Sequence, residues 1–235
     1  MTFWDFCAPF YDFAERTNGK AHAQMLEIVR KIVPQNASVL EVAAGTGAIS
    51  IAIADKVKSI LCTDVSANML AVAQKKAKRR GVSNVQFEHL DILSIDKQDN
   101  SFDVIIAGQV LHLLDKPQKA AAELRRIART MVILPIPLTK NLHGKAKLSM
   151  KLYRLFGFSP KFEFDMDEYA NFLPRIGFEH CEMIHIPGKM PMAVAVWKGG
   201  GEMIQDGTCS NPYCNCENCT CNPCLCTPEN PCGCA

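Results

Sequence analysis

The stretch VLEVAAGTG at residues 39–47 passes from an aliphatic run into a turn of small residues and leads into the apolar segment AISIAIA at residues 48–54. Aliphatic and β-branched residues favour a buried strand, and small residues let the backbone of a turn approach a ligand closely. A helix that begins after such a turn directs unpaired backbone N–H groups toward the same place. The stretch therefore predicts a strand, a turn and a helix around a bound ligand.

The glycines of this turn, taken alone, are weak evidence for a particular ligand. The dinucleotide-binding fingerprint needs a third glycine three residues after Gly47, where this chain has Ser50. That fingerprint also puts no acid just before the glycines, whereas Glu41 precedes Gly45 here. Other residues at strand ends are needed to identify the ligand.

Short aliphatic runs and helical periods alternate from residue 38 to about residue 139, which is the pattern of a parallel sheet with crossover helices. We expect strands at Ser38–Val42, Ser59–Thr63, Val85–Leu90, Phe102–Ala107 and Met131–Pro135. Helices are expected at Ala21–Val33, Gly47–Lys56, Ala67–Arg80, Gln118–Ala128, Gly144–Gly157 and Asp167–Ile176. Two final strands, Phe178–Ile186 and Pro191–Lys198, favour an antiparallel hairpin. The predicted fold is α/β, a doubly wound, mostly parallel sheet of seven strands.

Composition divides the chain at the three glycines of residues 199–201, which favour a flexible joint. All 26 Lys and Arg residues and 20 of the 24 acids precede this point, whereas nine of the 12 cysteines follow it. We expect a globular domain at residues 1–198, a flexible linker at 199–208 and a cysteine-rich tail at 209–235. The N-terminus does not resemble a secretory signal, and the longest uncharged apolar stretch has 13 residues, fewer than the ~18 of a spanning helix. A cytoplasmic location is therefore expected.

Two acids follow the second and third predicted strands. Asp64 stands 17 residues after Gly47, where a carboxylate can accept hydrogen bonds from both hydroxyls of a ribose. Asp91 follows the third strand. The other interpretation of Asp64 is a helix N-cap, for which Ser66 is the better candidate.

These motifs resemble those of the class I S-adenosylmethionine-dependent methyltransferases, in particular the small-molecule branch that includes quinone and phospholipid methyltransferases. The resemblance lies in residues 41–47, 64–70, 91–92 and 102–114, which follow one another in the order and spacing of that family. It extends over about Phe10 to Trp197.

The resemblance implies a binding site for S-adenosylmethionine. Glu41 would lie near the methionine amino group, Asp64 would hold the ribose, and Asp91 would face the adenine amino group. Tyr11 would belong to an aromatic segment that covers the cofactor. The cofactor-binding residues implied in this way are Tyr11, Glu41, Ala43, Gly45, Gly47, Asp64, Val65, Met69, Asp91, Ile92, Gly108 and Gln109. Residues 1–36 would form N-terminal lid helices, and residues 140–177 a helical substrate lid.

The chain departs from the family pattern at two places. Ala43 stands where many members have a glycine, which is tolerable if its φ angle is negative. The loop that usually carries a glycine before the fifth strand is contracted to residues 125–130.

Methyl transfer from a sulfonium is an in-line displacement, so it depends mainly on the position of the acceptor. A general base is needed only if the acceptor must lose a proton, and His112 is the candidate catalytic residue. The other interpretation of His112 is a packing residue. The expected acceptor is a small, apolar or amphiphilic molecule.

Nine basic residues and no acid lie between Leu124 and Phe162. In the helical part of this basic segment they alternate with large apolar residues. One interpretation is a solvated lid surface, and another is contact with an anionic membrane surface or a lipid-like acceptor. No nucleic-acid partner is expected, because no binding motif accompanies the charge.

The tail has too few large apolar residues to fold by burial, and it contains four C-x-C pairs. It resembles a metallothionein cluster domain, which implies a thiolate-bound metal, Zn(II), Cu(I) or Cd(II). The metal-ligating residues would be Cys209, Cys214, Cys216, Cys219, Cys221, Cys224, Cys226, Cys232 and Cys234. An iron–sulfur cluster or a disordered tail are the alternatives.

The cysteines also allow two other functions for the whole chain. Thiolates of Cys7, Cys62 and Cys181 could bind a soft ion, which would make the chain a methyltransferase of a metal or of a metalloid such as arsenite. Isolated cysteines are more often buried apolar residues. The non-enzymatic alternative is a metal buffer on a cofactor-binding scaffold.

Overall fold

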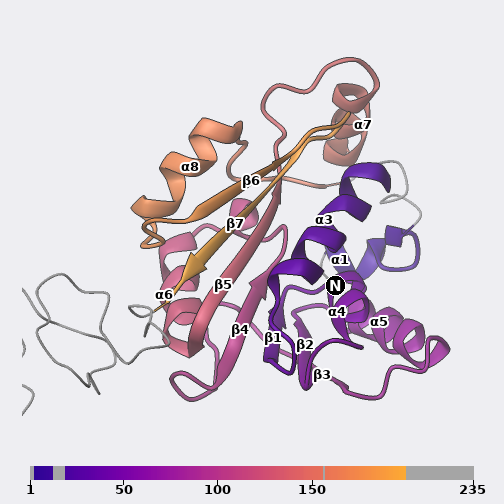
Figure 1. Cartoon of the computed structure of the whole chain (residues 1–235). Coiled ribbons are helices and arrows are strands. Elements are labelled where there is room, and N and C mark those ends of the chain that lie inside the picture. Colours follow the sequence, from indigo (N-terminus) through magenta and orange to yellow (C-terminus); the bar gives the residue numbers. More distant parts are fainter. Residues whose placement is uncertain (1–2, 13–18, 156, 200–235) are drawn as a thin grey trace, which may run out of the picture. The chain divides into compact units, whose positions relative to one another are not determined.

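The computed structural model describes residues 3–12, 19–155 and 157–199, and its first compact unit extends to Trp197. Its seven-stranded sheet has the order β3-β2-β1-β4-β5-β7-β6 (Figure 1). The strands are β1 (Ser38–Val42), β2 (Ser59–Asp64), β3 (Val85–His89), β4 (Phe102–Ala107), β5 (Ala128–Pro137), β6 (Glu182–Ile186) and β7 (Met192–Lys198). Strands β1 to β5 pair in parallel, and β6 pairs antiparallel with β7, so the predicted parallel sheet and hairpin are confirmed.

Helices cover both faces of the sheet (Figure 1). They are α1 (Phe3–Cys7), α3 (Gly19–Ile32), α4 (Ala48–Ile53), α5 (Ala67–Arg79), α6 (Pro117–Ile127), α7 (Gly144–Leu155) and α8 (Met166–Arg175), with the 3-10 helix η2 (Leu111–Leu113). No helix among the described residues is long and apolar enough to cross a membrane.

Neighbouring residues of the central strands point into different cores. Val39 packs in the core that includes α3 and α4, whereas Leu40 packs in the core that includes α6 and α8. Both residues are fully buried. A strand covered on both faces reads as a continuous apolar run, which explains why the stretch at residues 39–47 shows no polar alternation.

The junction between α6 and β5 contains no loop. The sequence predicts a fifth strand at Met131–Pro135, but β5 begins at Ala128, directly after Ile127 of α6. Ala128 pairs with Phe102, and the register then shifts before Val104 pairs with Met131. The early residues of β5 are thus held by pairing with β4, which the short aliphatic run does not indicate.

Several other predicted boundaries differ from those of the structure. The helix predicted at Gly47–Lys56 spans only Ala48–Ile53, and it begins after Gly47 because that residue has a left-handed φ of 71°. The strand predicted at Phe178–Ile186 begins only at Glu182, because His180 turns the chain with a φ of 55°. Helix α8 begins one residue before the prediction, with Asp165 as the N-cap of a capping box.

Candidate functional site

One cavity of about 300 Å³ collects residues from the carboxyl ends of β1, β2, β3 and β4 and from the N-terminal segment. Ligands of doubly wound sheets bind at these strand ends. Eleven of the twelve residues predicted to bind the cofactor line this cavity: Tyr11, Glu41, Ala43, Gly45, Asp64, Val65, Met69, Asp91, Ile92, Gly108 and Gln109. Gly47 is the exception.

Three residues of the turn after β1 have positive φ angles: Ala43 (50°), Gly45 (55°) and Gly47 (71°). A Cβ on Gly47 would lie 3.0 Å from the Cβ of Ala73 in α5, so Gly47 packs against a helix behind the turn. The condition under which an alanine would be tolerated at residue 43, a negative φ, is therefore not met. The Cβ of Ala43 makes the left-handed conformation costly, by about 1 kcal/mol or more.

Asp64 joins the two loops that border the cavity. One carboxylate oxygen accepts the backbone N–H of Gly45 at 2.7 Å, and the other accepts that of Ser66 at 2.8 Å. Burial raises the pKa of Asp64 above its usual value, and these hydrogen bonds oppose the increase. Ser66 itself caps α5 by accepting the N–H of Met69 at 3.2 Å, as its sequence position predicts. Asp64 therefore stays on the cavity wall as an acceptor.

Glu41 lines the cavity and is only 2% exposed. One of its carboxylate oxygens accepts both the backbone N–H of Ser50, at 2.8 Å, and the Ser50 hydroxyl. Burial raises the pKa of Glu41 to about 7, although both hydrogen bonds oppose this. A cationic group in the cavity would favour the ionised form of this acid.

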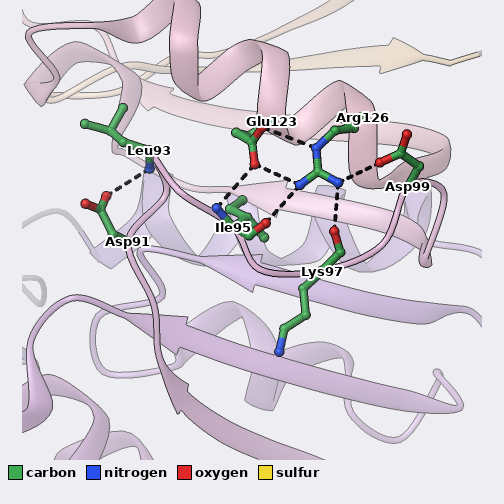
Figure 2. Close-up of polar contacts among 7 residues, drawn as sticks. All are labelled: Asp91, Leu93, Ile95, Lys97, Asp99, Glu123 and Arg126. Atoms are coloured by element: carbon green, nitrogen blue, oxygen red, sulfur yellow. Dashed lines mark hydrogen bonds and ion pairs between the residues drawn. The ribbon is translucent and has the colours of Figure 1, made fainter.

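The loop after β3 is fixed from outside the cavity by Arg126 of α6 (Figure 2). The guanidinium donates to the carbonyl oxygens of Ile95 at 2.9 Å and Lys97 at 2.7 Å. It also pairs with Asp99 and Glu123, and Glu123 accepts the N–H of Ile95 at 3.2 Å.

Asp91 begins the same loop and turns it, because its carboxylate accepts the N–H of Leu93 at 2.9 Å (Figure 2). Asp91 is exposed at the cavity, and the next residue, Ile92, is buried. The bonds from Arg126 lie four to eight residues after Asp91, so they fix the part of the loop that follows the cavity-lining residues.

Gly108 and Gln109 border the cavity after β4. A Cβ on Gly108 would lie 3.1 Å from the Cδ1 of Ile49, so the backbone packs closely against α4. Gln109 has a φ of 53°, and its N–H donates to the carbonyl of Pro135 at 2.7 Å. This places the loop after β4 over the end of β5.

Hydrogen bonds attach the N-terminal segment to the cavity rim. The Ser66 hydroxyl donates to Asp5 at 2.6 Å. Asp12 accepts the Thr46 hydroxyl at 2.6 Å and the Lys76 ammonium at 2.9 Å. These bonds hold the segment that carries Trp4 and Tyr11 over the cavity.

The sequence prediction missed several cavity residues, among them Trp4, Asp12, His22, Met25, Leu113 and Leu114. The aromatic cluster at residues 3–11 was the available signal for Trp4. The face of α3 that points inward marks Met25 as a core residue and does not distinguish packing from ligand contact.

Residues of the predicted substrate lid at 140–177 do not line this cavity where they are described. The ring of Phe158 contacts the N-terminal aromatic residues, with centroid distances of 6.3 Å to Phe3 and 6.2 Å to Trp4, and Trp4 lines the cavity. The helical segment therefore meets the cavity through the N-terminal aromatic residues.

His112 lies in η2, and its side chain is not part of the cavity wall. It is 4% exposed, burial lowers its pKa to about 4, and its Nδ1 has no partner among the described residues. Its carbonyl accepts the N–H groups of Lys161 and Phe162. The geometry favours packing, and the catalytic assignment of His112 stays a prediction.

Most cations of the basic segment are paired with acids from elsewhere in the chain. The pairs whose bases lie in this segment are Arg126 with Asp99 and Glu123, Arg129 with Asp103, Lys140 with Glu168, Arg154 with Glu163 and Lys161 with Asp115. Lys147 and Lys151 are exposed and make no ion pair within the described residues. The charge left over is thus concentrated on α7.

The cysteines of the globular unit do not form a soft-metal site in the described ranges, which hold no group of three His, Cys, Asp or Glu side chains able to bind a metal. Cys62 is buried in the core that includes α3 and α4, whereas Cys181 packs against the other core. Burial raises the pKa of Cys181 to about 11. The predicted linker beyond residue 199 and the cysteine tail lie outside the described residues.

Comparisons with known proteins show what this domain is similar to. Residues 39–131 match the family model described as a methyltransferase domain. The chain is 37% identical over 93 residues to the ubiquinone/menaquinone biosynthesis C-methyltransferase of Bdellovibrio bacteriovorus, covering 39% of each protein. It is 30% identical over 107 residues to the demethylmenaquinone methyltransferase of Geobacillus stearothermophilus, covering 44% of this chain and 46% of that protein.

These matches span less than half of the length of the relatives. A larger part of the chain resembles the solved structure of magnesium protoporphyrin IX methyltransferase from Synechocystis with bound SAH, with a TM-score of 0.58 and 19% identity over 76% of this chain and 83% of that one. Residues 39–131 are therefore similar to a methyltransferase domain, and they lie in a doubly wound fold that the chain shares with this solved methyltransferase structure.

Proposed function

We propose that this protein transfers a methyl group from S-adenosylmethionine to a small, apolar or amphiphilic acceptor. The observation that supports this most directly is the presence of eleven predicted cofactor residues on the wall of one cavity. Most residues that line this cavity fall within residues 39–131, which match a methyltransferase family model.

The residues of the cavity suit the chemical groups of this cofactor. Glu41 and the turn at residues 43–47 would hold the charged amino-acid end, and Asp64 would accept hydrogen bonds from the ribose hydroxyls. Asp91 and the backbone of Ile92 would contact the adenine ring. When bound, the cofactor supplies an electrophilic methyl group on sulfur. The protein contributes orientation and the exclusion of water.

The acceptor is proposed from the apolar part of the wall and from the names of the relatives. Trp4, Met25, Leu113 and Leu114 line the cavity and would favour an apolar ring or chain. The relatives described above are named for quinone methylation. A quinol-like acceptor is therefore the first compound to test.

The test is transfer of labelled methyl from S-adenosylmethionine to demethylmenaquinone in its reduced form. We expect turnover that Asp64→Asn reduces by about tenfold or more, because the ribose contact loses its charge. Asp103→Asn serves as the matched control, because Asp103 also accepts a backbone N–H, that of Ser38 at 2.8 Å, but does not line the cavity. Binding of the cofactor without transfer to any apolar acceptor would contradict the proposed activity.

We further propose that the nine cysteines of the tail bind metal ions through their thiolates, because four C-x-C pairs within 27 residues provide closely spaced sulfur ligands. Mass spectrometry of protein expressed with zinc should find several metal ions on the full chain and none on a chain that ends at Lys198. Equal metal content in both would refute this proposal.

A further inference from the structure

The helix α7 carries exposed apolar residues that no other described part of the protein covers. Leu148 is 69% exposed and Leu155 is 82% exposed, while Met150 of the same helix is buried. Large exposed apolar side chains that lie close together mark an interaction surface. In Figure 1 the helix lies beyond the end of β5, within the first compact unit.

Two lysines flank these leucines on one face of the helix. At 100° per residue, Lys147, Leu148, Lys151 and Leu155 fall within an arc of about 100°. Both lysines are exposed, and no ion pair neutralises them within the described residues, in contrast to Arg154, which pairs with Glu163. This face, which we call the α7 face, therefore combines apolar and cationic groups.

A second exposed apolar group lies in the N-terminal segment, which contacts the region just after α7. Phe6 is 64% exposed and Phe10 is 69% exposed. One turn before Phe6, the ring of Phe3 packs on Phe158 and lies 3.4 Å from a Cβ built on Gly157. The segment that carries Trp4 and Tyr11 over the cavity is thus joined to the end of α7.

We propose that the α7 face, together with Phe6 and Phe10, binds the surface of an anionic lipid membrane. The apolar side chains would enter the interface, and Lys147 and Lys151 would contact lipid phosphates. Charge favours this partner over a second copy of the chain, because the α7 face offers no acid to pair with the lysines of another copy. An apolar acceptor could then pass from the membrane toward the cavity beside Trp4.

Vesicle flotation of the full chain under reducing conditions tests this proposal. We expect binding to vesicles of phosphatidylcholine mixed with phosphatidylglycerol, weaker binding to phosphatidylcholine alone, and a decrease with added salt. Each lysine near an anionic surface contributes about fivefold to partitioning, so K147Q/K151Q should reduce it by about 30-fold. The matched control K75Q/K78Q removes two exposed lysines of α5 and should leave partitioning unchanged.

The leucines are tested separately. L148S/L155S should reduce partitioning into both kinds of vesicle by about tenfold or more, with an unchanged melting temperature, because both side chains are already exposed. Failure of the full chain to float with anionic vesicles, or an equal loss in K75Q/K78Q, would overturn the proposal. The proposal would also be overturned if light scattering showed a dimer that does not bind vesicles and that only L148S/L155S dissociates. None of these measurements uses methyl transfer, so a negative result would count against membrane binding and not against the proposed activity.

Discussion

The backbone N–H of Ser50 donates to the Glu41 carboxylate at 2.8 Å, and the Ser50 hydroxyl donates to the same oxygen. Ser50 occupies the place of the third glycine of a dinucleotide-binding fingerprint, so this chain has a hydrogen-bond donor where that fingerprint has no side chain. The donor keeps a buried acid at the cavity wall. The pair of Glu41 and Ser50 therefore distinguishes this turn from a dinucleotide-binding turn.

The first prediction concerns the pH dependence of stability. Burial raises the pKa of Glu41 to about 7, from a usual value of 4.5, so the folded protein binds this proton more tightly than the unfolded chain. The resulting stabilisation is complete below pH 4.5 and is lost as the pH rises to about 7. It amounts to at most about 3 kcal/mol.

Glu41→Gln removes this dependence. The free energy of unfolding of the ligand-free protein can be measured with urea at pH 5 and at pH 7.5. Between pH 5 and pH 7.5 it should decrease more for the unmodified chain than for Glu41→Gln. Other titrating groups are common to both proteins and cancel in the comparison. Identical decreases would mean that Glu41 is ionised throughout.

The second prediction concerns Asp64, whose carboxylate accepts the N–H groups of Gly45 and Ser66. Asp64→Ala leaves both donors without this acceptor and should reduce the free energy of unfolding by about 3 kcal/mol. Calorimetry should also show at least tenfold weaker binding of S-adenosylhomocysteine, because the ribose loses its acceptor.

Asp103→Ala separates these two effects. Asp103 accepts the N–H and hydroxyl of Ser38 at 2.8 and 2.7 Å, so its loss should destabilise the fold without changing ligand affinity. If both variants weaken binding equally, Asp64 acts on the ligand only through stability.

The third prediction concerns Arg126, which holds the loop after Asp91 by donating to Ile95, Lys97 and Asp99 (Figure 2). A lysine keeps the charge but lacks the planar fork that reaches these acceptors together. Arg126→Lys should therefore reduce the free energy of unfolding by about 2 kcal/mol and accelerate hydrogen exchange at the Ile95 amide.

Affinity for adenosine should also decrease several-fold in Arg126→Lys, because Asp91 and Ile92 precede the released loop. Arg30→Lys is the control, since Arg30 likewise pairs with Asp55 and donates to the Ala52 carbonyl at 2.8 Å. It should lose stability while adenosine affinity stays the same. If both Arg126→Lys and Arg30→Lys lost affinity for adenosine, the loss could not be assigned to the loop after Asp91.

The sequence predicted the parallel sheet because its strands are continuous apolar runs between turn residues. The resemblance of its motifs to a methyltransferase family implied the eleven predicted residues that line the cavity. The sequence could not predict residues whose place depends on tertiary contacts. Trp4 reaches the cavity through bonds such as that between Asp5 and Ser66, which are 61 residues apart.

The early start of β5 has a similar cause. Arg129 pairs with Asp103, and the hydroxyl of Thr130 donates to the Asp103 carbonyl at 2.6 Å. Polar residues at this point indicate a loop when only neighbours in sequence are considered. Pairing with β4 makes them a strand.

The last prediction concerns Ala43, which has a φ of 50° in a turn where a glycine would carry no penalty. Relief of the Cβ contact should outweigh the greater entropy of glycine in the unfolded chain, so Ala43→Gly should increase the free energy of unfolding by up to about 1 kcal/mol. Ala44→Gly is the matched control, because Ala44 is not among the residues with positive φ. This variant has only the entropic cost of glycine and should be destabilised by about 0.5–1 kcal/mol. Equal losses in the two variants, measured by urea unfolding, would show that the left-handed conformation of Ala43 costs the folded protein nothing.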